Sequence, residues 1–183
     1  MPKIETARLW LRPYTLDDLD ELAVILSNPE VMKYSPRGPI AKEKAKAVTY
    51  EVLEFFINHW QQHSFGVWAV VDKVTPKLLG HCGLNFLPNS PEVEVLYRLE
   101  QTYWNQGIAT EATKASLRYG FDSVKLEHIV AITVPEHKAS QRVMEKAGLK
   151  YEKNAYFYNL DVVYYAISRQ QWRSDDSPYI RLG

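Results

Sequence analysis

The stretch Trp104-Asn105-Gln106-Gly107-Ile108-Ala109-Thr110-Glu111-Ala112 decides the fold, because it joins a strand-like segment to a helix-like one. Residues 93–99 before it alternate between apolar and polar side chains, which predicts a strand, and residues 111–124 after it are helix-like. The turn between them places several backbone N–H groups at a helix N-terminus, where they have no partner within the helix. This end of a helix dipole is positive and favours an anion, so we interpret the stretch as a cradle for a pyrophosphate.

The cradle taken alone is weak evidence for a binding site. It contains one glycine, Gly107, and therefore matches neither the dinucleotide motif G-x-G-x-x-G nor the P-loop with its Gly-Lys-Ser/Thr ending. Without further context, an ordinary turn between a strand and a helix is the commoner explanation for such a stretch.

Length and composition restrict the class of protein. The 183 residues fit one domain, which we expect to span residues 1–173, followed by a polar and loosely held tail at 174–183. The formal net charge of zero argues against a nucleic-acid binder that relies on bulk positive charge. Cys82 is the only cysteine, so an intrachain disulfide and a Cys-x-x-Cys metal site are excluded. No apolar run is long enough for a membrane span, and we expect a soluble cytoplasmic protein without a metal.

The order of elements predicts an α/β fold with a mixed, mostly antiparallel sheet of about seven strands and helices on both faces. The expected strands are residues 8–13, 65–71, 78–86, 93–99, 128–134, 151–158 and 162–167. One expected helix follows the first strand and ends by residue 27, two span 42–62 and 111–124, and a fourth ends at 146. The loop at 29–40 has room for one helical turn.

Three stretches in order carry a resemblance to a known family. They are Glu5 to Pro13 followed by Leu26 to Met32, then Trp104 to Ala112, and finally Pro135 to Leu149. Over about residues 4–172 the chain resembles the GNAT superfamily of N-acetyltransferases, and within it the ribosomal-protein acetyltransferase-like (RimJ/RimL-type) branch. The resemblance implies a twisted sheet with a splayed parallel strand pair at the cofactor, acetyl-CoA as co-substrate, and no metal.

The resemblance also implies which residues hold acetyl-CoA. The backbone groups of one strand would bond the pantetheine arm; they belong to Tyr97, Arg98 and Leu99. The loop that follows would hold the pyrophosphate; its residues are Trp104, Asn105, Gln106, Gly107, Ile108, Ala109 and Thr110. Asn105 stands where a glycine is more common, for which we expect a small cost in loop geometry.

The candidate catalytic residues are Glu94 as the base that deprotonates the amine and Ser140 as the acid that protonates the leaving thiolate. Many GNAT enzymes use a tyrosine as the acid, but Met144 occupies the corresponding position and cannot donate a proton. His137 replaces a more usual asparagine and would hydrogen-bond the pantetheine. Each has a structural alternative: Glu94 as part of a half-exposed strand, Ser140 as a helix-start residue, and His137 as an exposed loop histidine.

The acceptor groove of the family maps onto Tyr34 and Arg37, and we add His81 as a candidate substrate-binding residue, with a core or edge position as its alternative. The function predicted is transfer of an acetyl group to a primary amine by direct attack in a ternary complex. The acceptor is a protein N-terminal α-amine or a small-molecule amine. A non-catalytic acyl-CoA-binding module and a structural protein with a degenerate site are the alternatives. We expect neither nucleic acid nor membrane as a partner, and leave a homodimer open.

Overall fold

The computed structural model describes residues 1–183 and contains one nine-stranded sheet. Its strands are β1 (Lys3–Glu5), β2 (Leu9–Arg12), β3 (Val67–Asp72), β4 (Leu78–Phe86), β5 (Val93–Leu99), β6 (His128–Thr133), β7 (Lys150–Phe157), β8 (Leu160–Ser168) and β9 (Ile180–Leu182). The α-helices are α1 (Leu19–Ser27), α2 (Pro29–Met32), α3 (Lys42–His63), α4 (Ile108–Tyr119) and α5 (Lys138–Lys146). The strand order is β7-β8-β6-β5-β4-β3-β2-β1-β9. The mixed sheet and its helices confirm the predicted fold class.

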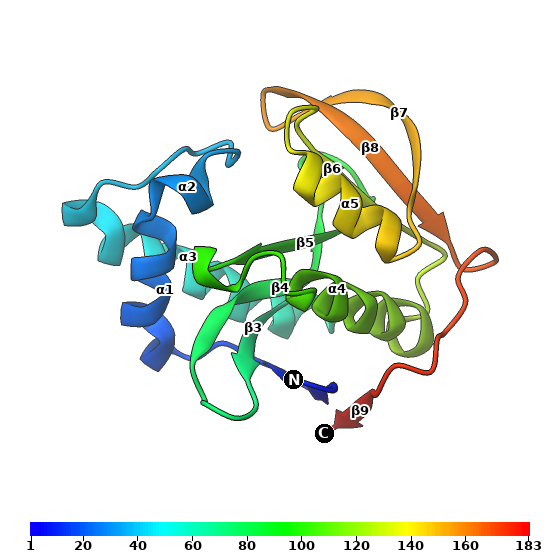
Figure 1. The fold of residues 1–183 in the computed structure, drawn as a ribbon, viewed down its shortest axis with the longest axis horizontal. Coiled ribbons are helices and arrows are strands. Elements are labelled where there is room, and N and C mark those ends of the chain that lie inside the picture. The colour runs from blue at the N-terminus through cyan, green and yellow to red at the C-terminus, as the bar shows by residue number, and fades with distance from the viewer.

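Helices cover both faces of the sheet, because its central strands are apolar on both sides (Figure 1). Helix α4 packs against β4 and β5 on one face, and α1 and α3 pack against each other on the other face. Along β3, Trp68 and Val70 join the core under α4, whereas Val67 and Ala69 join the core under α1 and α3. This alternation is the two-residue period of a strand that is buried on both faces.

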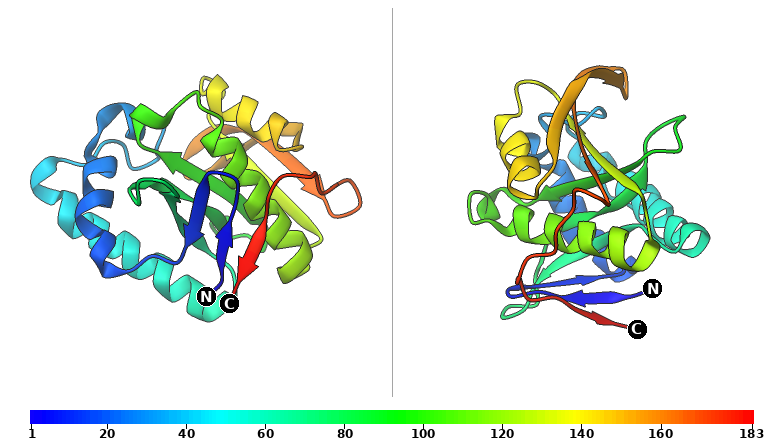
Figure 2. Two further views of the ribbon diagram at one scale, coloured as in Figure 1. Left: turned by 60° about the horizontal axis from the view of Figure 1, so that its bottom comes forward. Right: turned by 90° about the vertical axis from the view of Figure 1, so that its right-hand side faces the viewer.

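Strands β5 and β6 form the only parallel pair of the sheet, and they align at one position, Glu94 opposite Val130. All other neighbouring strands are antiparallel. Beyond the aligned pair the two strands run apart (Figure 2, right). The splayed pair that the family resemblance implies is therefore present.

The start of α1 is fixed to the sheet by Asp18. Its carboxylate accepts two hydrogen bonds from the guanidinium of Arg12, at 2.9 and 2.6 Å, and one from the backbone N–H of Thr15 at 2.9 Å. These contacts fix the helix start near Thr15 and Asp18, where the first turn is a 3₁₀ helix, Leu16–Asp18. No helix of the chain is both long and apolar enough to cross a membrane.

Two strands were not predicted. Residues 3–5 form β1, and the tail that was expected to be loosely held ends in β9, which pairs with β1 beside the N-terminus (Figure 2, left). Three-residue strands are too short for an alternating pattern to identify them, and β9 has no buried residue. Helix α4 also begins earlier than expected, at Ile108, and continues into a π-helical turn, Gly120–Val124. The division into a domain and a tail stays a prediction.

Candidate functional site

A cavity of about 1040 Å³ lies where β5 and β6 diverge. The loop after α2, helices α3 and α5, and the turn between β7 and β8 complete its walls. The residues that sequence reasoning selected line it with one exception, Gln106. The lining residues among them are Tyr34, Arg37, His81, Glu94, Tyr97, Arg98, Leu99, Trp104, Asn105, Gly107, Ile108, Ala109, Thr110, His137 and Ser140.

The loop between β5 and α4 has the geometry of an anion cradle. Gly107 adopts a left-handed conformation, with φ of 78°, and α4 begins at the next residue. The N–H groups of the first helical turn, at Ile108, Ala109 and Thr110, have no partner within the helix. Asn105 is also left-handed, with φ of 60°, a conformation that asparagine adopts more readily than most residues. This accounts for asparagine at a position where the family resemblance suggested glycine.

A tether holds this loop against the N-terminal segment. One carboxylate oxygen of Glu111 accepts hydrogen bonds from the hydroxyl of Thr6 at 2.6 Å and the backbone N–H of Arg8 at 2.9 Å, while the other accepts from Arg8 Nε at 2.7 Å. Arg8 Nη1 donates to the carbonyl of Gln106 at 2.8 Å. Sequence reasoning used the stretches around Arg8 and Glu111 as separate signals and missed that they are in contact. The signal in the sequence that could have indicated this contact was the presence of both stretches in one chain.

Glu94 places a buried carboxyl group in the cavity. Its side chain comes from β5, and the residue is 5% exposed. Burial raises the pKa of Glu94 to about 7, although a hydrogen bond from the Tyr158 hydroxyl at 2.7 Å acts in the opposite direction. A carboxyl group that titrates near neutrality can both take up and release a proton at physiological pH.

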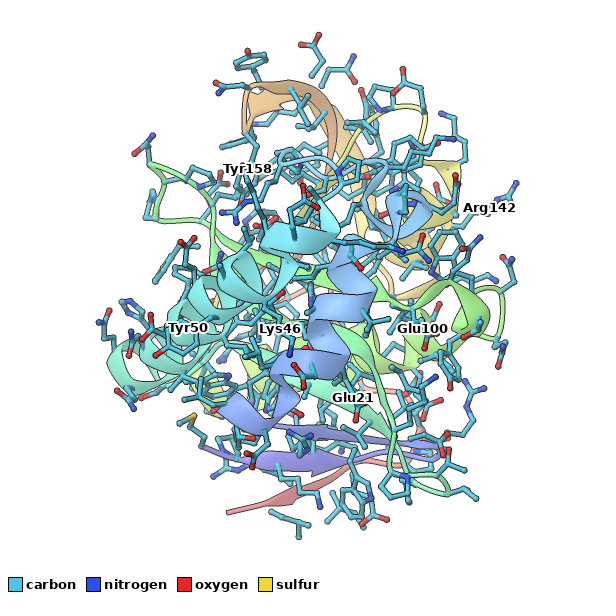
Figure 3. The ribbon with its side chains drawn as sticks, turned by 90° about the vertical axis from the view of Figure 1, so that its left-hand side faces the viewer. Glu21, Lys46, Tyr50, Glu100, Arg142 and Tyr158 are labelled. Carbon is cyan, nitrogen blue, oxygen red and sulfur yellow. The ribbon has the colours of Figure 1, made fainter.

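Tyr158 is a site residue that sequence reasoning missed. It was assigned to the end of a strand, but it forms a two-residue turn with Asn159 between the paired residues Phe157 and Leu160. Both turn residues are left-handed, with φ of 54° and 60°. A tyrosine in this conformation is strained, and here the turn brings its hydroxyl within 2.7 Å of the carboxylate of Glu94. In the view of Figure 3, Tyr158 is seen next to the N-terminal part of α3.

Ser140 and Tyr97 form a hydroxyl pair at the start of α5. The Tyr97 hydroxyl donates to the backbone carbonyl of Ser140 at 2.9 Å and lies 2.9 Å from Ser140 Oγ. Burial raises the pKa of Tyr97, so its phenol is protonated at neutral pH. The sequence drew attention only to the backbone of Tyr97, whereas its side chain supplies a second hydroxyl group. Met144 is 2% exposed and belongs to the core.

His137 and Tyr34 are in contact in the wall of the cavity. Their rings stack with centroids 4.3 Å apart, and His137 Nδ1 lies 3.2 Å from the hydroxyl of Thr133. Burial, followed by the positive charge of Arg98, lowers the pKa of His137, which favours the neutral imidazole. The half-buried, stacked ring differs from the exposed loop histidine considered as the alternative.

The chain is similar to one known protein family and to individual proteins within it. The profile of the family described as "Acetyltransferase (GNAT) domain" matches residues 8–150. The Bacillus subtilis (strain 168) protein named uncharacterized N-acetyltransferase YnaD is 30% identical over 177 residues, which cover 92% of this chain and 98% of YnaD. A GNAT-family acetyltransferase structure from Bacillus anthracis superimposes with a TM-score of 0.76 at 28% identity, covering 92% of this chain and 99% of that one.

A similar fold also occurs in Mycobacterium smegmatis RimJ, solved in complex with CoA-disulfide. The TM-score is 0.79 at 17% identity, with 94% of this chain and 90% of RimJ covered. The likeness to RimJ is one of fold and extends over almost the whole chain.

The hydrogen bond from Tyr158 leads to a prediction about the titration of Glu94. Because the phenol donates to the ionised carboxylate, Tyr158→Phe is expected to raise the pKa of Glu94 by about one unit, the equivalent of one hydrogen bond to a charged group. Carboxyl ¹³C NMR of the protein labelled at glutamate measures this shift. Tyr156→Phe is the matched control, since Tyr156 is 64% exposed on the same hairpin. A pKa that is equal in Tyr158→Phe and the wild type would contradict the assignment.

Proposed function

Because the chain belongs to the GNAT family of acetyltransferases, we propose that it moves the acetyl group of acetyl-CoA to a primary amine by direct attack in a ternary complex. The observation that carries the proposal is a single cavity that joins the left-handed loop at the start of α4 to the buried carboxyl of Glu94. Its volume of about 1040 Å³ is at the upper end of the range for one small ligand and suits two substrates together.

Acetyl-CoA fits one side of this cavity. The N–H groups at the start of α4 would bind the pyrophosphate, and the left-handed Gly107 leaves the approach to them free of a side chain. The divergence of β5 from β6 would let the amides of pantetheine bond the backbone of Tyr97, Arg98 and Leu99, in the manner of an added strand.

The proposed chemistry begins with deprotonation of the amine. A protein N-terminal ammonium has a pKa of roughly 8 and a lysine ammonium about 10.4, so a base is needed near pH 7. Glu94 would take this proton directly or through a water. The neutral nitrogen then bonds to the thioester carbon, and a backbone N–H of the Tyr97–Leu99 stretch would stabilise the oxyanion. When the carbon–sulfur bond breaks, Ser140 would protonate the thiolate, with the Tyr97 hydroxyl as its hydrogen-bond partner. The nitrogen of the new amide would lose its second proton, which returns to Ser140 through water.

The acceptor is a protein N-terminal α-amine or a small-molecule amine; both place a primary amine next to Glu94. A non-catalytic acyl-CoA-binding module is the second candidate, and the core position of Met144 in place of a tyrosine acid is the observation that favours it. The homodimer and the cytoplasmic location stay predictions.

Release of CoA thiol separates the two functions. The purified protein is incubated with acetyl-CoA and a panel of peptides with different N-terminal residues, amino acids and polyamines, and free thiol is measured against samples without acceptor. We expect thiol release that requires one class of amine. Binding of CoA without release over the whole panel would favour the module.

The role of Glu94 predicts a pH profile. The burial-raised pKa means that the base form is present above about pH 7, so wild-type kcat/KM is expected to fall as pH drops through this value. Glu94→Gln is expected to lower kcat/KM at pH 7 by roughly 10²- to 10⁴-fold, with recovery at high pH where the amine is neutral without help. Glu92→Gln is the control, because Glu92 bonds Tyr164 instead. An unchanged pH profile in Glu94→Gln would remove Glu94 from the mechanism.

The loop geometry predicts that Gly107→Val abolishes binding of CoA while the fold persists. A β-branched residue is strained at φ of 78° and would narrow the approach to the helix N-terminus, but its Cβ would meet only Arg8 Nη2, at 3.5 Å. Calorimetry with CoA and a thermal melt measure the two effects. Gly38→Val is the matched control, since Gly38 is also left-handed, with φ of 68°, but lies outside the cavity. Normal CoA affinity in Gly107→Val would count against the proposed function.

A further inference from the structure

Arg98 carries a positive charge into the cavity without a counterion. Its guanidinium takes part in none of the ion pairs and hydrogen bonds within the chain, although it lines the cavity. Other half-buried arginines differ in this respect. Arg12, Arg118 and Arg169 each have a carboxylate partner, and these partners are Asp18, Asp122 and Glu127.

The groups that face Arg98 do not supply a negative charge. His81 lies opposite Arg98 in the pairing of β4 with β5, and burial, with a smaller contribution from Arg98, lowers its pKa to about 3. Burial also raises the pKa of Tyr14, and His137 favours its neutral form. Burial lowers the pKa of Arg98 itself to about 10, which leaves it protonated at pH 7. A partly buried cation among neutral groups is costly unless a ligand supplies the anion.

Arg98 lies on the acceptor side of β5. Val95 and Tyr97 point to the core under α4, and Tyr97 reaches Ser140. Leu96 packs on the opposite side, under α1 and α3, and strand alternation places Glu94 and Arg98 on this same face. The proposed base and the unpaired cation therefore share one wall, whereas the loop for the pyrophosphate begins beyond the end of β5.

A second polar side chain, His81, lies opposite Arg98. His81 is 4% exposed and lines the cavity, and its Nδ1 is buried without a hydrogen-bond partner. Its ring edge packs on Phe56, with centroids 5.5 Å apart. Because Nδ1 is closed off from solvent, Nε2 is the atom of the neutral imidazole that would donate a hydrogen bond to a ligand next to the guanidinium. This is an arrangement for a polar ligand group rather than for apolar packing alone.

We propose that Arg98 binds a carboxylate of the acceptor, with His81 beside it, so that the acceptor is a small amine that carries a carboxylate, such as an amino acid or a short peptide. The planar guanidinium matches a carboxylate with two parallel hydrogen bonds. The N-terminal segment of a folded protein has a backbone amide where a free amino acid or short peptide has its carboxylate, and would therefore leave Arg98 unpaired. The inference rests on the proposed function for the site of the amine, and it decides between the two acceptor classes left open there.

Residues 94 and 98 are separated by about 13 Å along the strand, at about 3.3 Å per residue, and both side chains extend toward the acceptor. Each peptide unit adds about 3.5 Å between an amine and a carboxylate. The binding of an amino acid, a dipeptide and a tripeptide therefore measures which distance between amine and carboxylate the site accepts.

Calorimetric binding in the presence of saturating CoA tests the proposal without turnover. The ligands are the twenty amino acids, the alanine dipeptide and the alanine tripeptide, each as the free acid and as the C-terminal amide. We expect at least one free acid to bind wild-type protein about ten-fold more tightly than its amide. Arg98→Met is expected to reduce this ratio to about two or less in protein whose thermal melt shows an intact fold, and Arg98→Lys to keep an intermediate ratio. Arg173→Met is the control for loss of an exposed arginine and keeps the wild-type ratio.

The outcomes separate this inference from the proposed function. Equal binding of acids and amides by the wild type overturns the carboxylate site, and so does a ratio that survives in folded, CoA-binding Arg98→Met. If Arg98→Met does not fold, the Arg98→Lys variant decides. An undiminished preference for the free acid over the amide in Arg98→Lys overturns the carboxylate site, and a reduced preference supports it. A strong acid preference without thiol release in the turnover assay supports the carboxylate site and contradicts the acetyltransferase reaction.

Discussion

The separation of β5 from β6 is the constraint on which the site depends. Parallel strands normally bond along their whole length, but here the alignment is limited to Glu94 and Val130. Backbone N–H and C=O groups that lose a strand partner require another one, either water or a ligand. The chain leaves β5 into the loop of α4 and leaves β6 into α5, so both helices begin at the edges of the same opening. One local break in a sheet thereby assembles the backbone groups, the helix N-terminus and the hydroxyl of Ser140 in one cavity.

The two faces of β5 divide the proposed work. On the face under α4 and α5, Tyr97 meets Ser140, where the leaving sulfur would be protonated. On the face under α1 and α3, Glu94 and Arg98 would hold the two ends of the acceptor. Successive side chains of a strand point to opposite faces of the sheet. In β5 this alternation places the side chain proposed to assist the leaving thiolate on one face and those proposed to bind the acceptor on the other. Burial acts on both faces, since it raises the pKa of Glu94 and keeps the phenol of Tyr97 protonated.

The sequence was sufficient for the features that depend on local pattern. Alternation predicted the strand at residues 93–99, and the loop from Trp104 to Thr110 identified the cradle because a short turn there joins this strand to a helix. Contacts between distant segments were out of reach. Tyr158 reaches Glu94 across 64 positions and Arg8 reaches Glu111 across 103, and no local pattern encodes either pairing. The side chain of Arg98 was overlooked because a charged residue in an alternating strand reads as solvent-exposed, and only the fold reveals that no carboxylate lies beside it.

A crystal structure of the protein with bound CoA tests the central claim most directly. We expect the pantetheine arm between β5 and β6, with its amides bonded to the backbone of Tyr97, Arg98 and Leu99, and the pyrophosphate at the N–H groups that begin α4. We also expect the sulfur to point toward Ser140 and Glu94 to stay open to the acceptor side. CoA bound outside this opening, or β5 and β6 paired along their whole length in the complex, would contradict it.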